Sequence, residues 1–458
     1  MMDPRTRTLL EAPIGPTLMR LALPNVVVMV MQSSIGLTET YFVGWLGTDA
    51  LAGMSLVFPT LMLFQMISAG AMGGGILSAI ARTLGSDRRS EAGIITWHAV
   101  AIALGLGVAT TILMLAVDKP LYSAMGGHDA SLAAALTYAT IIFAGAIPLW
   151  LYNSLAAVIR GTGNILLPAA VTAVGAIILV PVSPILIFGW GPAPQLGIAG
   201  GAIAIVAFYV IGTVIFATYL WSGRGVLRPT PRPPRLQWKA MREILRVGAI
   251  SSLISVTTNI VIVVATGFVG AFGAAAVAGY GTGSRLEYFL VPLAFGFGGP
   301  LAAMVGTSIG AGQRARALKV TWIGAGITFA ITEAIGLAGA LYPQAWLSLF
   351  DTDPTMLAMG TKYLHSVGPF YGFFGGGLAL YFASQGAGRL AWPLFAAAIR
   401  VAIALGGGYF ALKITGGIDG VFLAIGVALA ASGLINAAAI AAGVWFDRAP
   451  SKVIPATR

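Results

Sequence analysis

The sequence predicts an all-α integral membrane protein with twelve transmembrane helices in two parallel six-helix repeats. Three observations predict this fold class. Only 9% of the 458 residues are charged, whereas 58% are hydrophobic. The hydrophobic residues form continuous runs long enough to cross a bilayer. The second half of the chain also repeats the spacing of glycines and arginines in the first half.

The composition excludes a water-soluble fold. Soluble globular chains carry roughly 25% charged residues, and a chain with so few could not cover its surface with polar groups. In a soluble protein the net charge of +11 would suggest nucleic acid, but here the basic residues lie between hydrophobic runs, so no nucleic-acid partner is expected. The absence of cysteine excludes disulfides and thiolate metal sites.

Twelve hydrophobic runs reach the length of about 20 residues that a helix needs to cross a membrane. The polar segment 1–16 before the first run has no signal-peptide core, so that run is expected to remain as a helix. The predicted spans are 17–43, 51–77, 93–117, 131–157, 165–189, 197–222, 243–270, 276–304, 319–342, 356–384, 391–412 and 418–446.

The basic residues in the loops predict the orientation. Lys and Arg concentrate on the side that holds both termini and the long connection after the sixth span, and such loops stay in the cytoplasm. The opposite side holds only Lys119 and Lys413, with Lys362 at a helix end. We therefore expect a multi-pass protein of the inner membrane with both termini cytoplasmic.

The two halves of the chain repeat each other. A shift of 226 residues places Arg20 on Arg246 and Arg88 on Arg314, together with several glycines. Further along, the shift becomes 225 residues, where Gly161 meets Gly386. We expect an N-terminal lobe at 1–222 and a C-terminal lobe at 241–458, joined by a Pro/Arg-rich cytoplasmic linker at 223–240. Six spans per repeat make the repeats parallel, and two such lobes can rock about a cavity between them.

Ionisable groups inside the membrane are the first functional candidates, because an unpartnered charge in hydrocarbon is costly. Glu39 in the first span is the predicted ion-coupling residue, since its repeat partner is Ala265 and the fold therefore does not require a carboxylate there. A buried carboxylate can take up a proton on one side and release it on the other. The alternative is a glutamate whose flexible stem reaches the interface.

Arg285 and Glu287 in the eighth span are predicted cavity residues, and Arg285 could meet Glu39 across the cavity; a structural pair between helices is the alternative. For Glu333 a structural hydrogen bond is the favoured interpretation, and for His365 a packed or interfacial position. Whether these two and Glu287 face the cavity is left open. The three histidines do not cluster, so no metal site is expected.

Uncharged polar side chains inside the spans complete the candidate site. Each must bond a neighbouring helix, water or the substrate, and helix-to-helix bonding is the alternative to a cavity role. The substrate and cavity candidates of this kind are Gln32, Tyr41, Gln65, Asn153 and Asn259.

No sequence feature indicates an enzyme or an ATPase. The run Gly73-Gly74-Gly75 lacks the lysine and the strand–helix context of a phosphate-binding loop, and no nucleophile–histidine–acid set is present. We expect no cofactor, and only a proton or a sodium ion as the coupling ion.

The chain resembles the MATE family, multidrug and toxic compound extrusion. The resemblance rests on Arg20-Leu-Ala-Leu-Pro24 with Glu39-Thr-Tyr-Phe-Val-Gly44, on Arg285-Leu-Glu287 with Val305 to Gly312, and on Arg160-Gly-Thr-Gly163 with Pro168. It covers the whole chain and is strongest to the DNA-damage-inducible branch. It implies antiport of an organic, often cationic and amphipathic compound against protons or sodium, with Glu39 as the coupling acid.

The chain also departs from that family. The fifth span of the family often carries an asparagine and an aspartate, where this chain has Leu179 and Ser183. A sodium site needs several oxygen ligands, whereas a proton needs one titratable group, so proton coupling through Glu39 is favoured.

The predicted function is a secondary active antiporter that exports organic compounds in exchange for protons. The alternatives are a sodium-coupled drug antiporter and a flippase of a lipid or a lipid-linked saccharide. The expected partners are a small-molecule substrate and membrane lipid, without ATP, and the expected state is a monomer because one chain contains both lobes.

Overall fold

The computed structural model describes residues 3–191, 194–350 and 353–446, and the side chains of 31–40, 274–275 and 288–289 lie outside that description. Every regular element in the described part is helical. The first half contains α1 (Pro4–Glu11), α2 (Ile14–Gly44), α3 (Thr48–Gln65), η1 (Met66–Met72), α4 (Gly73–Gly85), α5 (Arg89–Ala124), α6 (Asp129–Ala144), α7 (Ala146–Gly161), α8 (Leu166–Phe188) and α9 (Ile198–Trp221).

The second half follows the same plan with more interruptions. It contains α10 (Trp238–Gly270), α11 (Ala274–Ser284), α12 (Glu287–Gly310), α13 (Arg314–Leu341), α14 (Pro343–Leu347), α15 (Pro354–Val367), η2 (Gly368–Phe370), α16 (Tyr371–Ala387), α17 (Ala391–Val401), η3 (Ala402–Gly407), α18 (Gly408–Thr415) and α19 (Asp419–Ala441).

The predicted spans coincide with these helices. Within the described residues, nine helices are long and apolar enough to cross a membrane, and ten if α6 and α7, bent by 49°, count as one. The other two predicted spans, 17–43 and 356–384, coincide with α2 and with α15, η2 and α16. The second of these is interrupted at Gly368-Pro369, because proline lacks the N–H that a continuous helix needs.

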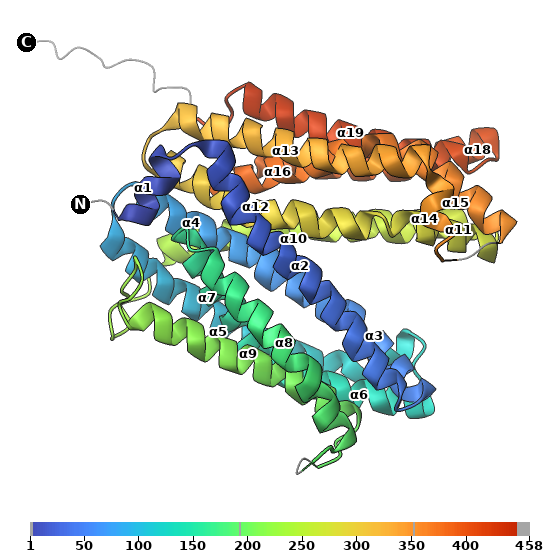
Figure 1. Ribbon diagram of the computed structural model, residues 1–458, viewed down its shortest axis with the longest axis horizontal. Coiled ribbons are helices and arrows are strands. Elements are labelled where there is room, and N and C mark those ends of the chain that lie inside the picture. The colour runs from blue at the N-terminus through green and yellow to red at the C-terminus, as the bar shows by residue number, and fades with distance from the viewer. Residues whose placement is uncertain (1–2, 192–193, 351–352, 447–458) are drawn as a thin grey trace, which may run out of the picture.

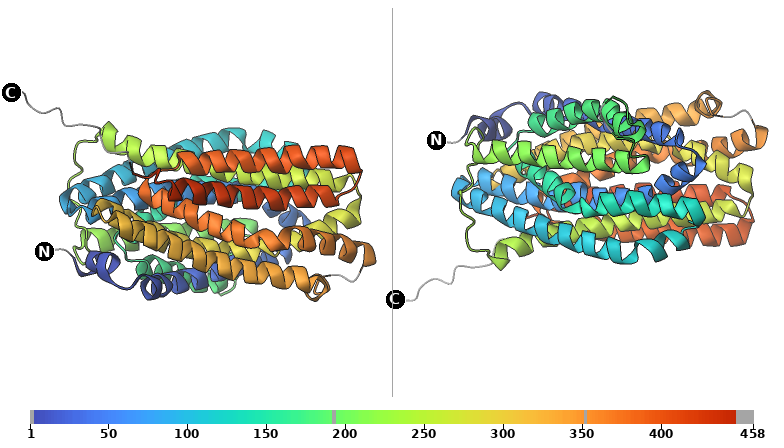
Figure 2. Two further views of the ribbon diagram at one scale, coloured as in Figure 1. Left: turned by 90° about the horizontal axis from the view of Figure 1, so that it is seen from above. Right: turned by 90° about the horizontal axis from the view of Figure 1, so that it is seen from below.

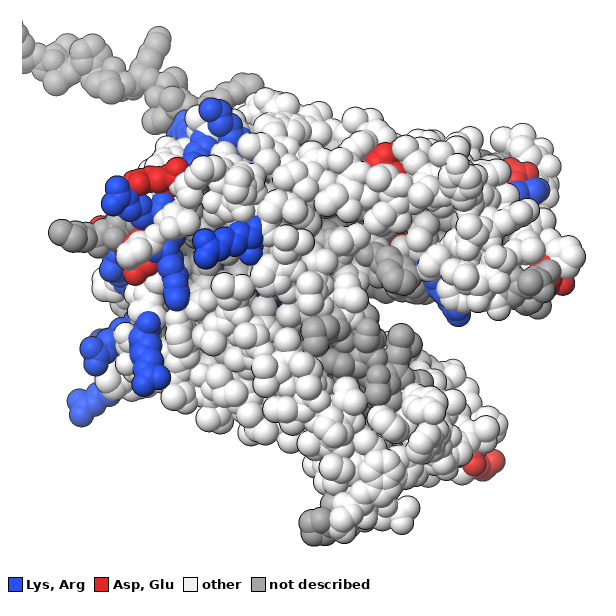
Figure 3. All heavy atoms as spheres, viewed as in Figure 1, with Lys and Arg blue, Asp and Glu red and all other residues white. Residues whose placement is uncertain are grey.

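The two halves form two bundles that touch at one end and diverge at the other (Figure 1; Figure 2). The core of the first bundle includes Trp150 and Phe216, and one core of the second includes Tyr371 and Phe422. In Figure 3 the surface is hollowed between the bundles, and we call this hollow the cleft.

Two long helices cross between the halves. Leu18, near the start of α2, packs with Leu301 of the second half, whereas Val43, near its end, belongs to the core of the first half. The start of α10 behaves in the opposite sense, since Ile244 packs in the first half and Ala265 in the second. The bundles in space therefore exchange the first parts of α2 and α10, which the division of the sequence into two lobes does not capture.

Most of the charged side chains visible in Figure 3 lie near the two ends of the molecule. The turns between α4 and α5, α9 and α10, and α12 and α13 lie at the end where the bundles touch, and Lys and Arg gather there (Figure 3). We call this the basic end. The helix α1 and the last turn of α19 lie there too (Figure 1), and the cleft opens at the opposite end.

Candidate functional site

In the first half, a polar cluster forms where α3 passes into the π-helical turn η1. Asn153 of α7 donates from Nδ2 to Ser68 Oγ at 2.8 Å and to Gln65 Oε1 at 3.4 Å. The hydroxyl of Tyr209 donates to the same Gln65 oxygen at 3.2 Å. A π-helical turn widens the backbone locally, and such turns are frequent at functional sites. The predicted candidates Gln65 and Asn153 are thus in direct contact, and we call these four residues the N-half cluster.

The N-half cluster can offer hydrogen bonds to a ligand. Asn153 is buried and has two acceptors for its amide nitrogen, which fixes its orientation. Gln65 is only partly buried, and its Oε1 accepts from both neighbours. Its own amide N–H groups are therefore the donors that an organic compound could reach.

In the second half, Glu287 is the centre of another polar cluster. Its Oε1 accepts from the hydroxyls of Tyr363 and Tyr371, the latter at 3.3 Å. Arg400 lies near enough for its charge to act on Glu287, and its Nη2 donates to Thr258 Oγ1. We call these five residues the C-half cluster. It joins α12, α15, α16, α17 and α10.

The C-half cluster is packed among aromatic rings. The ring of Tyr280 meets that of Tyr363 edge-on at 5.2 Å between centroids, and both contact Phe422. Tyr363 and Tyr371 are buried, so their hydroxyls need an acceptor from the protein. Hydroxyls in hydrophobic spans of the sequence could have indicated these tyrosines, which the sequence reasoning missed.

Arg285 does not join the C-half cluster. Its side chain is exposed and its guanidinium lies 5.4 Å from the centroid of the Phe350 ring, a cation–π contact. Arg285 lies in the turn between α11 and α12 and Glu287 begins α12, so the predicted span 276–304 is interrupted there and the two side chains have different surroundings.

The other predicted cavity residues are dispersed or lie outside the described residues. Tyr41 is exposed and packs edge-on against Trp45 at 5.3 Å between ring centroids. Asn259 is exposed and bonds Ser255 O of its own helix at 3.0 Å. The side chains of Gln32 and Glu39 fall within 31–40, outside the described residues, so the coupling role of Glu39 and its meeting with Arg285 stay predictions.

The remaining ionisable side chains have structural contacts. Glu333 Oε2 accepts from the backbone N–H of Gly372 at 2.6 Å, which caps the start of α16 as the structural interpretation expected. His98 is buried, with Nε2 accepting from the Gln237 backbone N–H at 2.7 Å, so it ties the linker to α5. His365 is exposed. Within the described residues, no group of three His, Cys, Asp or Glu side chains could hold a metal ion.

Two positions equivalent under the 225-residue shift lie where the bundles touch, and they differ in charge. Gln385 is buried and donates from Nε2 to Gly70 O at 3.2 Å and to Ser251 Oγ at 3.0 Å. Its equivalent, Arg160, lies beside Gly299 and Asn25, and its guanidinium has no hydrogen-bond or ion-pair partner among the described residues. The Arg160 side chain is partly buried.

Comparison with known proteins shows what the chain is similar to. The family model described as MatE matches twice, over residues 24–185 and 249–410, and the second match begins 225 residues after the first. This is one of the two displacements of the predicted repeat. A FAD transporter of Shewanella oneidensis is 29% identical over 78% of both chains. The "Probable multidrug resistance protein NorM" of Deinococcus radiodurans is 30% identical over 76% of this chain and 77% of its own.

The solved structures agree in fold. One described as MATE in the bent conformation superposes with a TM-score of 0.88 and covers 96% of this chain and 98% of that chain. Its sequence is 23% identical, so the likeness shows the fold alone.

Proposed function

The chain belongs to the MatE family of multi-pass membrane transporters, and from this premise we propose that it exports organic compounds in exchange for protons. Members of this family move small molecules and are not enzymes. The observation that carries the proposal is the family match in both halves, together with a cleft between those halves that is open at one end. A cleft between two similar bundles can face each side of a membrane in turn.

The proposed direction of export follows from the charge distribution. The basic end is proposed to face the cytoplasm, because positively charged loops stay on that side of the inner membrane. The cleft then faces outward, ready to release a substrate. Both termini would be cytoplasmic, with lobes 1–222 and 241–458 joined by the linker at 223–240. One chain contains both halves, which supports a monomer that works within the lipid and without ATP.

The proposed coupling residue is Glu39. It lies in α2, the helix that crosses from one half to the other, and it is the acid that the family resemblance marks. Proton binding would neutralise Glu39 and change the free-energy difference between the state that is open at the basic end and the state that is open at the opposite end. The N-half cluster is the proposed contact for the substrate, because Gln65 presents free amide donors there.

The test is uptake of ethidium into inverted membrane vesicles at a fixed pH gradient, with and without sodium. We expect transport by the native protein that follows the pH gradient and ignores sodium, and its loss in Glu39→Gln. The control is Glu91→Gln, a carboxylate that pairs with Arg88 on the surface. Native activity in Glu39→Gln would remove Glu39 from the mechanism, and a requirement for sodium would replace the proton as coupling ion.

A second candidate function is export of a compound that carries a phosphate group. Arg160 favours it, because a partly buried guanidinium without a partner among the described side chains can bind an anion. The relative from Shewanella oneidensis named as a FAD transporter fits the same chemistry.

The test of this candidate compares transport of FAD with that of riboflavin, which has the same ring system and no phosphate. We expect Arg160→Gln to abolish the preference for FAD, whereas Arg232→Gln in the linker removes a charge without this effect. Equal transport of both compounds by the native protein would reject the candidate. Transport of neither FAD nor ethidium would favour a flippase.

A further inference from the structure

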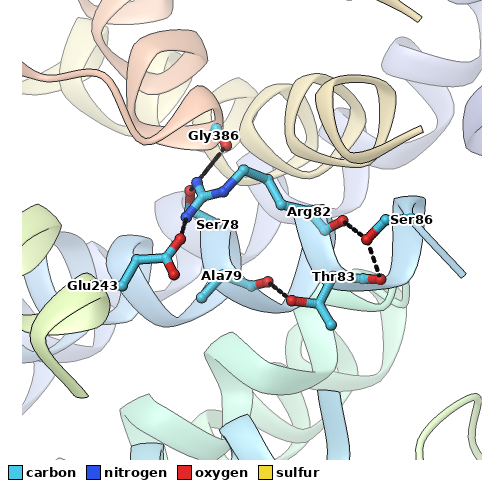
Figure 4. A network of polar contacts seen from close by, with 7 residues as sticks. All are labelled: Ser78, Ala79, Arg82, Thr83, Ser86, Glu243 and Gly386. Carbon is cyan, nitrogen blue, oxygen red and sulfur yellow. Dashed lines mark hydrogen bonds and ion pairs between the residues drawn. The ribbon is translucent and has the colours of Figure 1, made fainter. Parts of the chain in front are cut away.

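At the basic end, one arginine of the first half is bound to two helices of the second half (Figure 4). Arg82 of α4 pairs through Nη2 with Glu243 Oε1 of α10 at 2.6 Å. Its Nη1 donates to the carbonyl oxygen of Gly386 in α16 at 3.0 Å, and it also bonds Ser78 Oγ. Ser78 in turn donates to the same Gly386 oxygen at 2.9 Å.

The low solvent exposure of Arg82 makes these hydrogen bonds important for its stability. The Arg82 side chain is only 16% exposed, whereas that of Glu243 is 58% exposed. A guanidinium so far out of water needs its acceptors, because the lost hydration has to be replaced. The carboxylate, by contrast, stays hydrated whether or not it is paired. Arg82 therefore depends on the contact more than Glu243 does.

The contact lies where the two halves are packed backbone against backbone. A Cβ atom built on Gly306 would lie 2.9 Å from Ala81 Cβ, closer than real Cβ atoms approach. A Cβ on Gly85 would meet the Thr307 carbonyl, and one on Gly310 would meet that of Arg82. Under a 225-residue shift the Gly85 contact maps onto the Gly310 contact and the Gly306–Ala81 contact maps onto itself, so these contacts fix the shift here and place the crossing of α4 and α12 on the axis that relates the halves.

The ionic contact itself does not obey that symmetry. Under the 225-residue shift Arg82 corresponds to Thr307, whose hydroxyl bonds Ala303 O in its own helix at 2.8 Å. Glu243 corresponds to Leu18, which is buried in a hydrophobic core. The crossing is thus closed by a charged contact on the side of α10 and α16 and by apolar packing on the other. Because one side closes without charges, the fold does not require them.

We propose that Arg82 is the gating residue of the basic end: it holds α4, together with the start of α10, to α16 while the cleft is open at the opposite end. This inference rests on the proposed function, since only an alternating transporter must open both ends. Opening the basic end moves α4 and the start of α10 away from α16, which breaks the bond from Arg82 to Gly386 O, whereas the pair with Glu243 stays within the first bundle. The bond to Gly386 therefore favours the state with the basic end closed.

The magnitude follows from the bond that is lost. One hydrogen bond to a charged group favours a state by roughly tenfold in population, and Arg82 makes one such bond between the bundles, to Gly386 O. We expect Arg82→Gln to raise the ratio of basic-end-open to basic-end-closed protein about tenfold. Arg82→Lys keeps the charge near Glu243 but lacks the planar fork that reaches Glu243 and Gly386 O together, so its effect should be intermediate.

The experiment measures the width of the cleft mouth directly. The native chain has no cysteine, so Met125→Cys and Leu349→Cys, both exposed and at the open end of opposite halves, place two spin labels without a background. Double electron–electron resonance in lipid nanodiscs then gives the populations of long and short distances. We expect Arg82→Gln to increase the short-distance population. Arg88→Gln, which loses only a surface pair with Glu91, should leave it unchanged.

Two outcomes would overturn the inference: unchanged populations in Arg82→Gln, or an equal shift in Arg88→Gln. If Arg82→Gln fails to fold, Arg82→Lys serves instead, because it keeps the charge beside Glu243 and loses the guanidinium that reaches Gly386; an unchanged distribution in that variant would be equally decisive. The distance measurement needs no substrate. Absence of ethidium transport with a shifted distribution would therefore reject the proposed function and leave the gating role intact.

Discussion

Removing the carboxylate of Glu287 should destabilise the second half of the protein. Tyr363 and Tyr371 are buried, with 1% and 0% of their surface exposed, and both donate to Glu287 Oε1. Glu287→Leu leaves two buried hydroxyls without that acceptor and leaves Arg400 without a nearby negative charge. An unsatisfied buried polar group costs about 1–3 kcal/mol, so we expect a loss of at least about 3 kcal/mol.

Glu287→Gln separates the two contributions. The glutamine keeps a carbonyl oxygen for the tyrosines and loses only the charge, so the expected loss is about 1–2 kcal/mol. Arg285→Gln, two residues away and exposed, is the matched control and should change stability by less than about 0.5 kcal/mol.

The assay is thermal unfolding in detergent, followed by the fraction that remains monodisperse on size-exclusion chromatography. Unfolding of such proteins is commonly irreversible, so the three variants are compared at one heating rate. The expected order of apparent melting temperatures is native and Arg285→Gln, then Glu287→Gln, then Glu287→Leu. A Glu287→Leu variant as stable as Arg285→Gln would refute the reasoning and show that water satisfies the two hydroxyls.

Three further predictions follow from other contacts. Glu333→Ala removes the acceptor of the Gly372 N–H and should lower stability by about 1 kcal/mol in the same assay, with Glu333→Gln less affected; equal stability of both variants would contradict the capping role. Gly306→Leu places a side chain where even a Cβ would lie 2.9 Å from Ala81, so the basic end should close poorly. The spin-label distances across the cleft mouth should then shorten, and an unchanged distribution would contradict the tight crossing. Asn153→Ala releases Gln65 and Ser68 and should weaken ethidium binding, measured by fluorescence titration, about tenfold while leaving the melting temperature within a few degrees; unaltered binding would remove the N-half cluster from the substrate site.

The spans were predictable from the sequence because each is a long hydrophobic run, and the lipid bilayer requires such runs to be helical. The repeat was predictable because helices that cross at close range keep their glycines, as the Gly85 and Gly310 pair shows. The interruption at Gly368-Pro369 falls inside a run that is hydrophobic throughout. Hydropathy alone therefore does not reveal it, although proline marks the place.

The contacts of the candidate site were only partly predictable. Gln65 and Asn153 could be singled out as amides in hydrocarbon, but their contact joins positions 88 apart in the sequence. The tyrosines that bond Glu287 lie 76 and 84 residues away, so helix packing alone decides that they meet. Arg82 follows the predicted span 51–77, and the Lys and Arg residues of the loops served only to orient the protein.

The crossing of α2 and α10 between the halves was not predictable either. Both helices contain long hydrophobic runs, and these runs do not indicate which partner each part will meet. The segment that carries Glu39 belongs to α2, which packs through Leu18 in the second half and through Val43 in the first half. The proton-coupling proposal depends on this helix because it contacts both bundles.

The most direct test of proton-coupled export is the movement of protons driven by the substrate itself. Purified protein is reconstituted into liposomes that contain a pH indicator, without sodium and without a pre-formed pH gradient, and an outward or inward gradient of ethidium is imposed. We expect the native protein to move protons against the direction of ethidium flow and Glu39→Gln to move none. Ethidium flow without any proton movement, or proton movement that persists in Glu39→Gln, would contradict the proposal.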